Sequence, residues 1–205
     1  IGLKDMLKYP DYISKLISFL KKLPGIGFKS AEKIAFELLE WDPSQIEAMA
    51  LALQEFSTSH ATCSNCFCLK ISQTSPCNFC SESRDSSSLC IVATPKDVFA
   101  LEKSKIFKGH YFVLGNLLSP ITGKHLSLEK LAILKQRIEA CSPKEMIIAL
   151  DATLEGDATA LFLKQEFSYL PIKISRLALG MPVGLSFDFV DANTLARAFS
   201  GRNCF

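Results

Sequence analysis

The stretch CSNCFCLKISQTSPCNFC, residues 63–80, contains two CxxC pairs separated by ten residues. A two-residue gap lets two thiolates converge on one tetrahedral ion, and a second pair completes the shell. Because four sulfurs leave no open coordination position, the sequence predicts a structural zinc ion, one per chain, and not a catalytic metal. The predicted ligands are Cys63, Cys66, Cys77 and Cys80.

The alternatives to zinc at these cysteines are two local disulfides or four free thiols. Lys15, Lys21 and Lys22 interrupt the apolar run that a signal peptide would need, and no stretch has the length of a membrane span. We therefore expect a cytoplasmic chain without membrane contact, in which thiols stay reduced and paired CxxC motifs favour a metal. Cys68, two residues past Cys66, is an alternative ligand.

Composition sets the outer limits of the fold and of the partners. With 205 residues, 48% of them hydrophobic, the chain can form one large domain or two small ones, each with a real core. The net charge is only +2, which is weak for a nucleic-acid-binding protein taken as a whole. Any DNA contact must therefore come from a local patch, or from several copies of one.

On the N-terminal side, the turn LPGIG at 23–27 separates two helical patterns, at 12–20 and 28–39, and an apolar helical stretch follows from Trp41 to about Ala61. A helix, a Gly-x-Gly turn and a second helix form the helix-hairpin-helix pattern. The residues expected to face inward are Tyr12, Ile13, Leu16, Ile17, Leu20, Ala31, Ile34, Ala35 and Leu38.

This turn is the predicted DNA contact. Glycines without side chains let backbone N–H groups approach a phosphate, and the N-terminus of the next helix adds its positive dipole end. Lysines lie on one face of that helix and beside the turn. An ordinary Pro-Gly turn between two core helices, with a solvated lysine face, is the alternative. The predicted DNA-binding residues are Gly25, Gly27, Lys29, Lys33 and Lys22.

On the C-terminal side, a serine-rich run at 81–88 reads as a linker, and short apolar runs then alternate with helical patterns. This alternation predicts a largely parallel sheet with helices on both faces, whose functional loops lie at the carboxyl ends of the strands. We expect strands at 89–93, 111–114, 146–150 and 172–177, and helices beginning near Pro95, at 127–140 and at 158–167.

A resemblance to a known family covers nearly the whole chain. It rests on LPGIGFKSAEKIAFELL, the four cysteines, IVATPKDVFALE, GHYFVLGNLLSP, ALDATLEGDATA, SRLALGMPVG and the terminal GR, in this order. Together these segments resemble the RecR family of bacterial recombination mediators. The resemblance implies a homo-oligomer, a dimer or a ring-like tetramer around DNA. It also implies action in the bacterial nucleoid with RecO, and in some bacteria RecF, to load RecA onto single-stranded DNA.

The resemblance also implies a fold class, a multidomain α+β and α/β chain with a Toprim-type parallel domain. The expected division is a helix-hairpin-helix region at 1–60, a four-cysteine zinc finger at 61–82, a linker at 83–88, a Toprim domain at 89–180 and a C-terminal segment at 181–205.

Catalysis is disfavoured by the residues at the expected strand ends. Toprim enzymes use a glutamate after the first strand and an Asp-x-Asp pair after a later one to hold Mg²⁺. The second element is present here in altered form, as Glu155 and Asp157, but Ala93 and Thr94 replace the first, where relatives often carry glutamate. The sequence therefore predicts a protein that is not an enzyme. A Mg²⁺-dependent nuclease or topoisomerase is the alternative.

Two interpretations of Glu155 and Asp157 stay open. These residues can serve as capping charges before the helix expected from Ala158, or as an acidic surface for RecO, which the resemblance implies. Phe28 replaces a proline common in the family, and its ring either stacks on DNA or packs against another subunit. A zinc-containing interaction protein without a DNA role is the third functional hypothesis, and the glycine hairpin with its lysines disfavours it.

Overall fold

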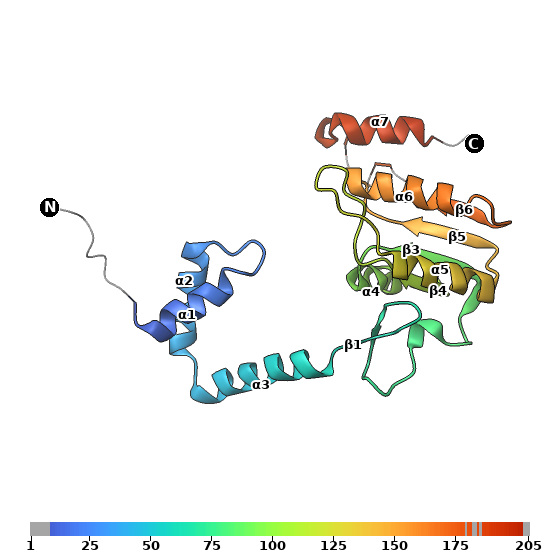
Figure 1. The fold of residues 1–205 in the computed structure, drawn as a ribbon. Coiled ribbons are helices and arrows are strands. Elements are labelled where there is room, and N and C mark those ends of the chain that lie inside the picture. Colours follow the sequence, from blue (N-terminus) through green and yellow to red (C-terminus); the bar gives the residue numbers. More distant parts are fainter. Residues whose placement is uncertain (1–8, 179, 182–183, 185, 203–205) are drawn as a thin grey trace. The chain divides into compact units, whose positions relative to one another are not determined.

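The computed structural model describes residues 9–178, 180–181, 184 and 186–202, which form two compact units that divide between Ser59 and His60 (Figure 1). Parts of the expected C-terminal segment, at 182–183, 185 and 203–205, lie outside the described residues. Among the helices that the structure describes, none combines the length and the apolar character needed to cross a bilayer.

The first unit is a helical hairpin followed by one longer helix. Helices α1 (Asp11–Leu20) and α2 (Phe28–Glu37) flank the Gly-x-Gly turn, and a short 3-10 turn (Leu38–Glu40) leads into α3 (Pro43–Ser59). The predicted helix-hairpin-helix is therefore confirmed. Its buried core is small, and the two alanines let the helices approach closely. The core residues are Ile13, Ile17, Ala31 and Ala35.

Two sequence expectations for this unit need correction. Tyr12 was expected on the buried stripe of α1, but its side chain is 65% exposed. Successive residues of a helix are about 100° apart, so Tyr12 falls to one side of the stripe that Ile13 and Ile17 define. The inward-facing Ile34 and Leu38 are half-buried, because the described part of the unit offers little for them to pack against.

The second unit is built on a four-stranded parallel sheet with the strand order β4-β3-β5-β6. This confirms the predicted parallel α/β architecture. The strands are β3 (Asp85–Val92), β4 (Gly109–Val113), β5 (Glu145–Ala149) and β6 (Lys173–Arg176). The helices are α4 (Pro95–Ser104), α5 (Leu128–Cys141), α6 (Leu154–Glu166) and α7 (Ala192–Ser200).

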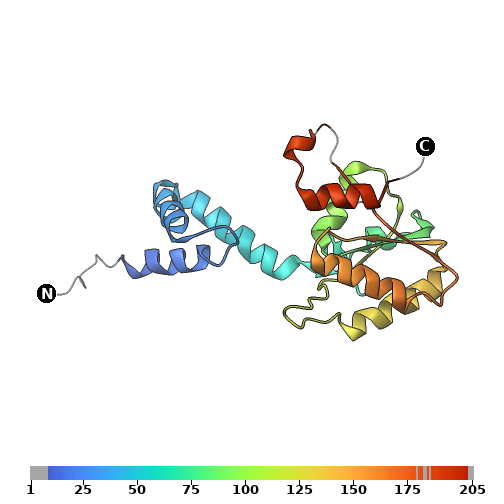
Figure 2. The ribbon, with the colours of Figure 1, turned by 90° about the horizontal axis from the view of Figure 1, so that it is seen from above.

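Alternating side chains of the central strands define two cores, one on each face of the sheet. Leu89 and Ile91 pack with α5 and α6, whereas Cys90 and Val92 pack with α4 and with the four-cysteine segment. Figure 2 shows α5 and α6 (yellow and orange) on one side of the sheet and α4 (green) on the other. The four-cysteine segment, together with α4, thus covers this face of the sheet.

Two predicted boundaries are wrong. Residues 85–88 belong to β3 and not to a linker, since Asp85 pairs with Gly109 and Ser88 with Glu145 across the sheet. Their polar side chains reflect the more exposed start of this strand. Helix α6 begins at Leu154 and not near 158, with the Thr153 hydroxyl accepting a hydrogen bond from an N–H of the first turn.

Candidate functional site

The four predicted metal ligands come together in space. Their sulfur atoms all lie within 4.8 Å of one another. The Cys63 and Cys80 sulfurs are 3.9 Å apart, and those of Cys66 and Cys77 are 3.5 Å apart. A tetrahedral ion with metal–sulfur bonds of about 2.3 Å would place its ligands about 3.8 Å apart. The cluster therefore has the dimensions of a closed four-sulfur metal site.

Local backbone turns bring each pair of cysteines into position. The Phe67 N–H donates to the Cys63 carbonyl oxygen, and the Cys63 N–H donates to the Cys68 carbonyl oxygen, both at 2.9 Å. Phe67 adopts a left-handed backbone, with φ of 58°, to close this turn. Strands β1 (Ala61–Thr62) and β2 (Leu69–Lys70) flank the first pair, and a 3-10 turn (Asn78–Cys80) carries the second.

Cys68, the alternative ligand, lies outside the four-sulfur cluster. Its side chain is fully buried, and its sulfur faces the Cys66 carbonyl oxygen at 3.8 Å. It packs in the core beneath β3 and β4. Cys68 is therefore a core residue beside the centre, and the symmetric set of four is the one that the structure assembles.

The surroundings of the cluster fit a doubly charged cation such as zinc. A hydrogen bond with Cys66 and burial raise the pKa of the Cys80 thiol, which a metal ion would reverse by binding the thiolate form. The Arg137 guanidinium also indicates that the cluster carries negative charge. Its Nη1 donates to the Cys80 sulfur at 3.2 Å, and its Nε and Nη2 are buried without a hydrogen-bond partner among the described residues. A buried cation suits a site with net negative charge.

The centre is fastened to the sheet of the second unit. The Val113 N–H, at the end of β4, donates to the Cys66 carbonyl oxygen at 2.9 Å. The Arg84 guanidinium lies over the rings of Phe79 and Tyr111, at 5.7 and 5.2 Å. Arg84 also forms an ion pair of 2.6 Å with Glu102. These contacts join the four-cysteine segment to the sheet, so the segment and the sheet belong to one folding unit.

The predicted DNA contacts lie on open surface. Gly25 has a φ of 80°, which favours glycine, and Gly27 caps the start of α2 in an extended conformation. A Cβ added at either glycine would meet no described atom within 4 Å. The side chains of Lys22, Lys29 and Lys33 are exposed. The turn can therefore receive a phosphate without any rearrangement of the unit.

Aromatic rings accompany the lysines of this turn. The Lys22 ammonium lies over the Phe19 ring at 4.9 Å, and the Lys21 ammonium lies over the Phe28 ring at 5.9 Å. Phe28 is half exposed and does not join the buried core of the hairpin. The Phe28 ring is thus exposed on the surface next to a lysine. Stacking on DNA and packing against another subunit both require such an exposed ring.

At the strand end where Toprim enzymes place a glutamate, this chain has a helix cap. Thr94 caps α4, and its N–H donates to the Asp97 carboxylate at 2.7 Å. The neighbouring strand end carries a cation, since the Lys130 ammonium donates to the Leu114 carbonyl oxygen at 2.9 Å. Burial lowers the pKa of Lys130. A partly buried ammonium close to this edge makes it a poor place for Mg²⁺.

The structure uses the two acidic residues of α6 differently. The Asp157 carboxylate is held by Arg176 of β6 and Arg197 of α7, each at 2.7 Å. Hydrogen bonds from Arg197 and then Arg176 lower its pKa. Within the part of the chain that the structure describes, the Glu155 carboxylate accepts a single long hydrogen bond, 3.4 Å, from the Ser119 hydroxyl. Both lie in the first turn of α6, so the expectation that they precede the helix is corrected.

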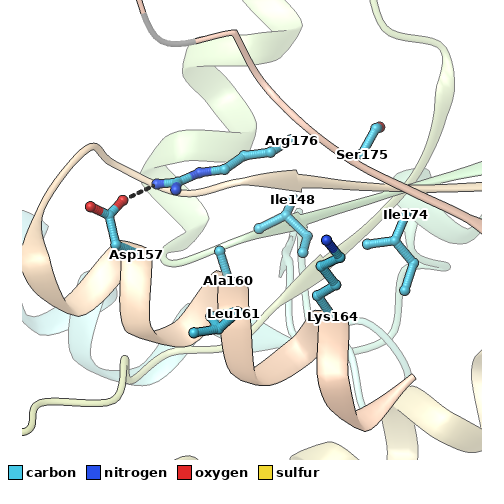
Figure 3. Close-up of a pocket in the computed structure, with 8 residues that line it drawn as sticks. All are labelled: Ile148, Asp157, Ala160, Leu161, Lys164, Ile174, Ser175 and Arg176. Atoms are coloured by element: carbon cyan, nitrogen blue, oxygen red, sulfur yellow. Dashed lines mark ion pairs between the residues drawn. The ribbon is translucent and has the colours of Figure 1, made fainter. Parts of the chain in front are cut away.

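Figure 3 shows the Asp157–Arg176 pair at one end of a pocket between α6 and β6, with a volume of about 300 Å³. The Lys164 side chain lies along the same pocket.

Sequence patterns did not single out Arg84, Arg137, Arg176 or Arg197, because their partners are far away in the chain and leave no local spacing to recognise.

A helix-hairpin-helix, a closed four-cysteine cluster and a Toprim-type sheet without its first carboxylate define a class of multidomain DNA-processing protein. Family models agree along the chain: "RecR, helix-hairpin-helix" matches residues 13–56, "Toprim domain" matches 87–178, and "RecR, C-terminal" matches 180–203.

Relatives show the family. A recombination protein RecR of Chlamydia muridarum is 90% identical over 98% of this chain and 100% of its own length. The Chlamydia caviae protein of that name is 69% identical over 97% of this chain and 99% of its own length. That of Citrifermentans bemidjiense is 43% identical over the same shares. The chain belongs to the RecR family of DNA recombination proteins, as its sequence motifs predicted.

Proposed function

We propose that this chain is a non-catalytic DNA-binding clamp of recombinational repair, which acts with RecO, and in some bacteria RecF, to help load RecA onto single-stranded DNA. The open glycine turn of the hairpin carries the proposal. It offers a backbone with open space at Gly25 and Gly27, a helix N-terminus without acidic residues in its first turn, and three exposed lysines. Such contacts go to phosphates and are independent of sequence.

Assembly into a dimer or ring supports this function, because one hairpin neutralises only a few phosphates. Several hairpins on one DNA would add through their effective concentration. The apolar side chains of α3 favour self-association, since no residue of α3 is buried within the described part of the chain and large apolar side chains at exposed positions mark interfaces. The exposed ones are Ile46, Met49, Leu51, Leu53 and Phe56.

RecO is the proposed partner of the acidic first turn of α6. Glu155 is the better candidate of the two, because the Asp157 carboxylate is already shared between two arginines. Loss of RecO retention on immobilised Glu155→Gln protein, with retention kept in Glu129→Gln, would support this contact. If both variants retain RecO equally, Glu155 does not contact RecO.

The DNA contact is tested by Lys29→Ala combined with Lys33→Ala. We expect weaker binding and a salt dependence reduced by about two phosphate contacts for each engaged subunit, measured by fluorescence anisotropy at several salt concentrations. Lys96→Ala with Lys103→Ala removes the same charge from exposed positions of α4 and should bind like the wild type. If both double variants behave alike, the hairpin is not the DNA site.

The absence of catalysis is tested with supercoiled plasmid. With Mg²⁺ or Mn²⁺ the protein should neither nick, relax nor prime DNA, because Thr94 caps a helix where a catalytic carboxylate would stand and Lys130 lies near the same edge. Nicking that co-purifies with the protein and is abolished by Asp157→Ala would establish the enzymatic alternative instead.

A further inference from the structure

Arg137 is a half-buried residue whose Nε and Nη2 atoms are shielded from solvent, and no carboxylate pairs with it in the described part of the chain. None of the ion pairs found there includes it. Its Nε and Nη2 atoms have no hydrogen-bond partner among the described residues, whereas Nη1 donates to the Cys80 sulfur at 3.2 Å. A buried guanidinium in such surroundings is costly unless a nearby group supplies negative charge.

The metal-loaded cysteine cluster supplies that charge. Four thiolates and one divalent cation carry two net negative charges, whereas four protonated thiols carry none. A positive charge fixed beside one ligand therefore stabilises the loaded centre and leaves the metal-free centre unassisted. The hydrogen bond from an ionised donor to an ionised sulfur is also stronger than one between neutral groups.

The packing of α5 fixes the position of Arg137. It lies on α5 between Leu134 and Ile138, which are 0% and 2% exposed in the core of the second unit. Its sulfur partner is 57 residues earlier in the chain, on the turn that carries the second cysteine pair. The hydrogen bond therefore joins the cysteine cluster to a helix that is anchored in the core.

We propose that Arg137 is a positioning residue of the metal centre: its charge and its hydrogen bond to Cys80 raise the affinity for the metal and tie the centre to helix α5. Groups that hydrogen-bond to metal ligands in this way usually contribute a factor of about 10 to 100 in affinity. The inference concerns the stability of the metal centre and does not depend on the proposed DNA function.

The experiment compares zinc affinities of the full-length protein by competition with a chelator of known affinity. Arg137→Met, which keeps an unbranched stem able to pack on the core and removes the guanidinium and its charge, should bind zinc roughly 10 to 100 times more weakly. Arg137→Lys keeps the charge and should recover part of the loss. Lys135→Met removes one charge from an exposed position of the same helix and should leave the affinity unchanged.

A cobalt spectrum separates this role from simple packing. In Co²⁺-loaded Arg137→Met, the sulfur-to-metal charge-transfer band should shift because one ligand has lost its hydrogen-bond donor, while the bands of tetrahedral Co²⁺ persist. Unchanged zinc affinity in Arg137→Met would overturn the proposal. If that variant does not fold, the zinc affinities of Arg137→Lys and Arg137→Gln are compared instead. Tighter zinc binding by the lysine variant would support a role for the positive charge, and equal zinc binding by the two variants would overturn the proposal.

Discussion

The two units of this chain differ in how they use their unusual residues. Among its described residues, 9–59, the hairpin unit buries four side chains and leaves the apolar residues of α3 exposed, whereas the second unit packs both faces of its sheet. In the second unit, the cysteines that the sequence singles out, and arginines that it does not, also hold the fold together. In the hairpin unit, Gly25 shapes the turn with its positive φ, whereas Gly27 and the exposed lysines make no packing contact that the described fold depends on.

The glycines make this contrast concrete. A Cβ on Gly109 would come within 2.5 Å of the Ser88 carbonyl oxygen, and one on Gly156 within 2.1 Å of the Asp151 carbonyl oxygen. Both glycines allow backbone segments of the second unit to approach each other. A Cβ on Gly27 would point into open space. The first two glycines are therefore structural, and Gly27 is free to serve a ligand.

Replacing a metal ligand should produce the largest effect, confined to one unit. Cys66→Ser combined with Cys77→Ser should lose the one metal ion per chain and unfold the segment from Cys63 to Cys80, because metal binding supplies much of its folding energy. The core under β3 and β4 should loosen with it, since Cys66 is fully buried there. Metal analysis and hydrogen exchange measure both effects.

The hairpin unit is the internal control of that experiment. Because it is a separate compact unit, amide protection in α1 and α2 should stay as in the wild type. Stoichiometric metal in the double variant would rule out the ligand assignment. Loss of protection in both units together would show that they fold as one and would break the comparison.

A matched pair of glycine variants sharpens the comparison. Gly109→Ala should destabilise the protein by about 1–3 kcal/mol, because its Cβ meets backbone that has little room to move. Gly27→Ala should change stability by less than about 1 kcal/mol, since its φ of −82° suits alanine. Urea unfolding measures both changes.

The DNA affinities of these variants should follow the opposite order. Gly27→Ala should weaken DNA binding, because a methyl group would separate the backbone N–H groups from a phosphate. Gly109→Ala should bind DNA normally at temperatures where it is folded. Normal binding by Gly27→Ala would show that the DNA does not approach the turn closely.

The sequence could predict the elements whose signals are local. Two CxxC pairs gave all four members of the cluster, and apolar runs gave the four parallel strands. Local patterns fail where partners are distant. The Arg137–Cys80 contact spans 57 positions, and the Asp157–Arg197 contact spans 40, so that only folding reveals them. The start of β3 was missed because its first residues are polar and exposed, which is also the composition of a linker.

The smallest expected effect concerns the ion pairs that join α7 to α6 and β6 within the second unit. Asp157 of α6 forms ion pairs with Arg197 of α7 and Arg176 of β6, and these arginines lower the pKa of the carboxyl. A lowered pKa in the folded state means that the pairing contributes stability above the ordinary carboxyl pKa. That contribution is lost as the pH falls through the lowered value. The side chain is 35% exposed, so screening should limit the contribution to less than about 1 kcal/mol.

Comparing wild type with Asp157→Asn isolates this contribution, because other acidic groups titrate alike in both proteins. The difference in the free energy of unfolding should be constant from pH 7 to about pH 5 and should vanish once the pH is below the lowered pKa of Asp157, where both proteins have a neutral group at this position. Arg197→Gln should reduce the same difference at neutral pH, and high salt should do so too. A difference that persists in acid would assign the effect of Asp157→Asn to helix packing and not to charge.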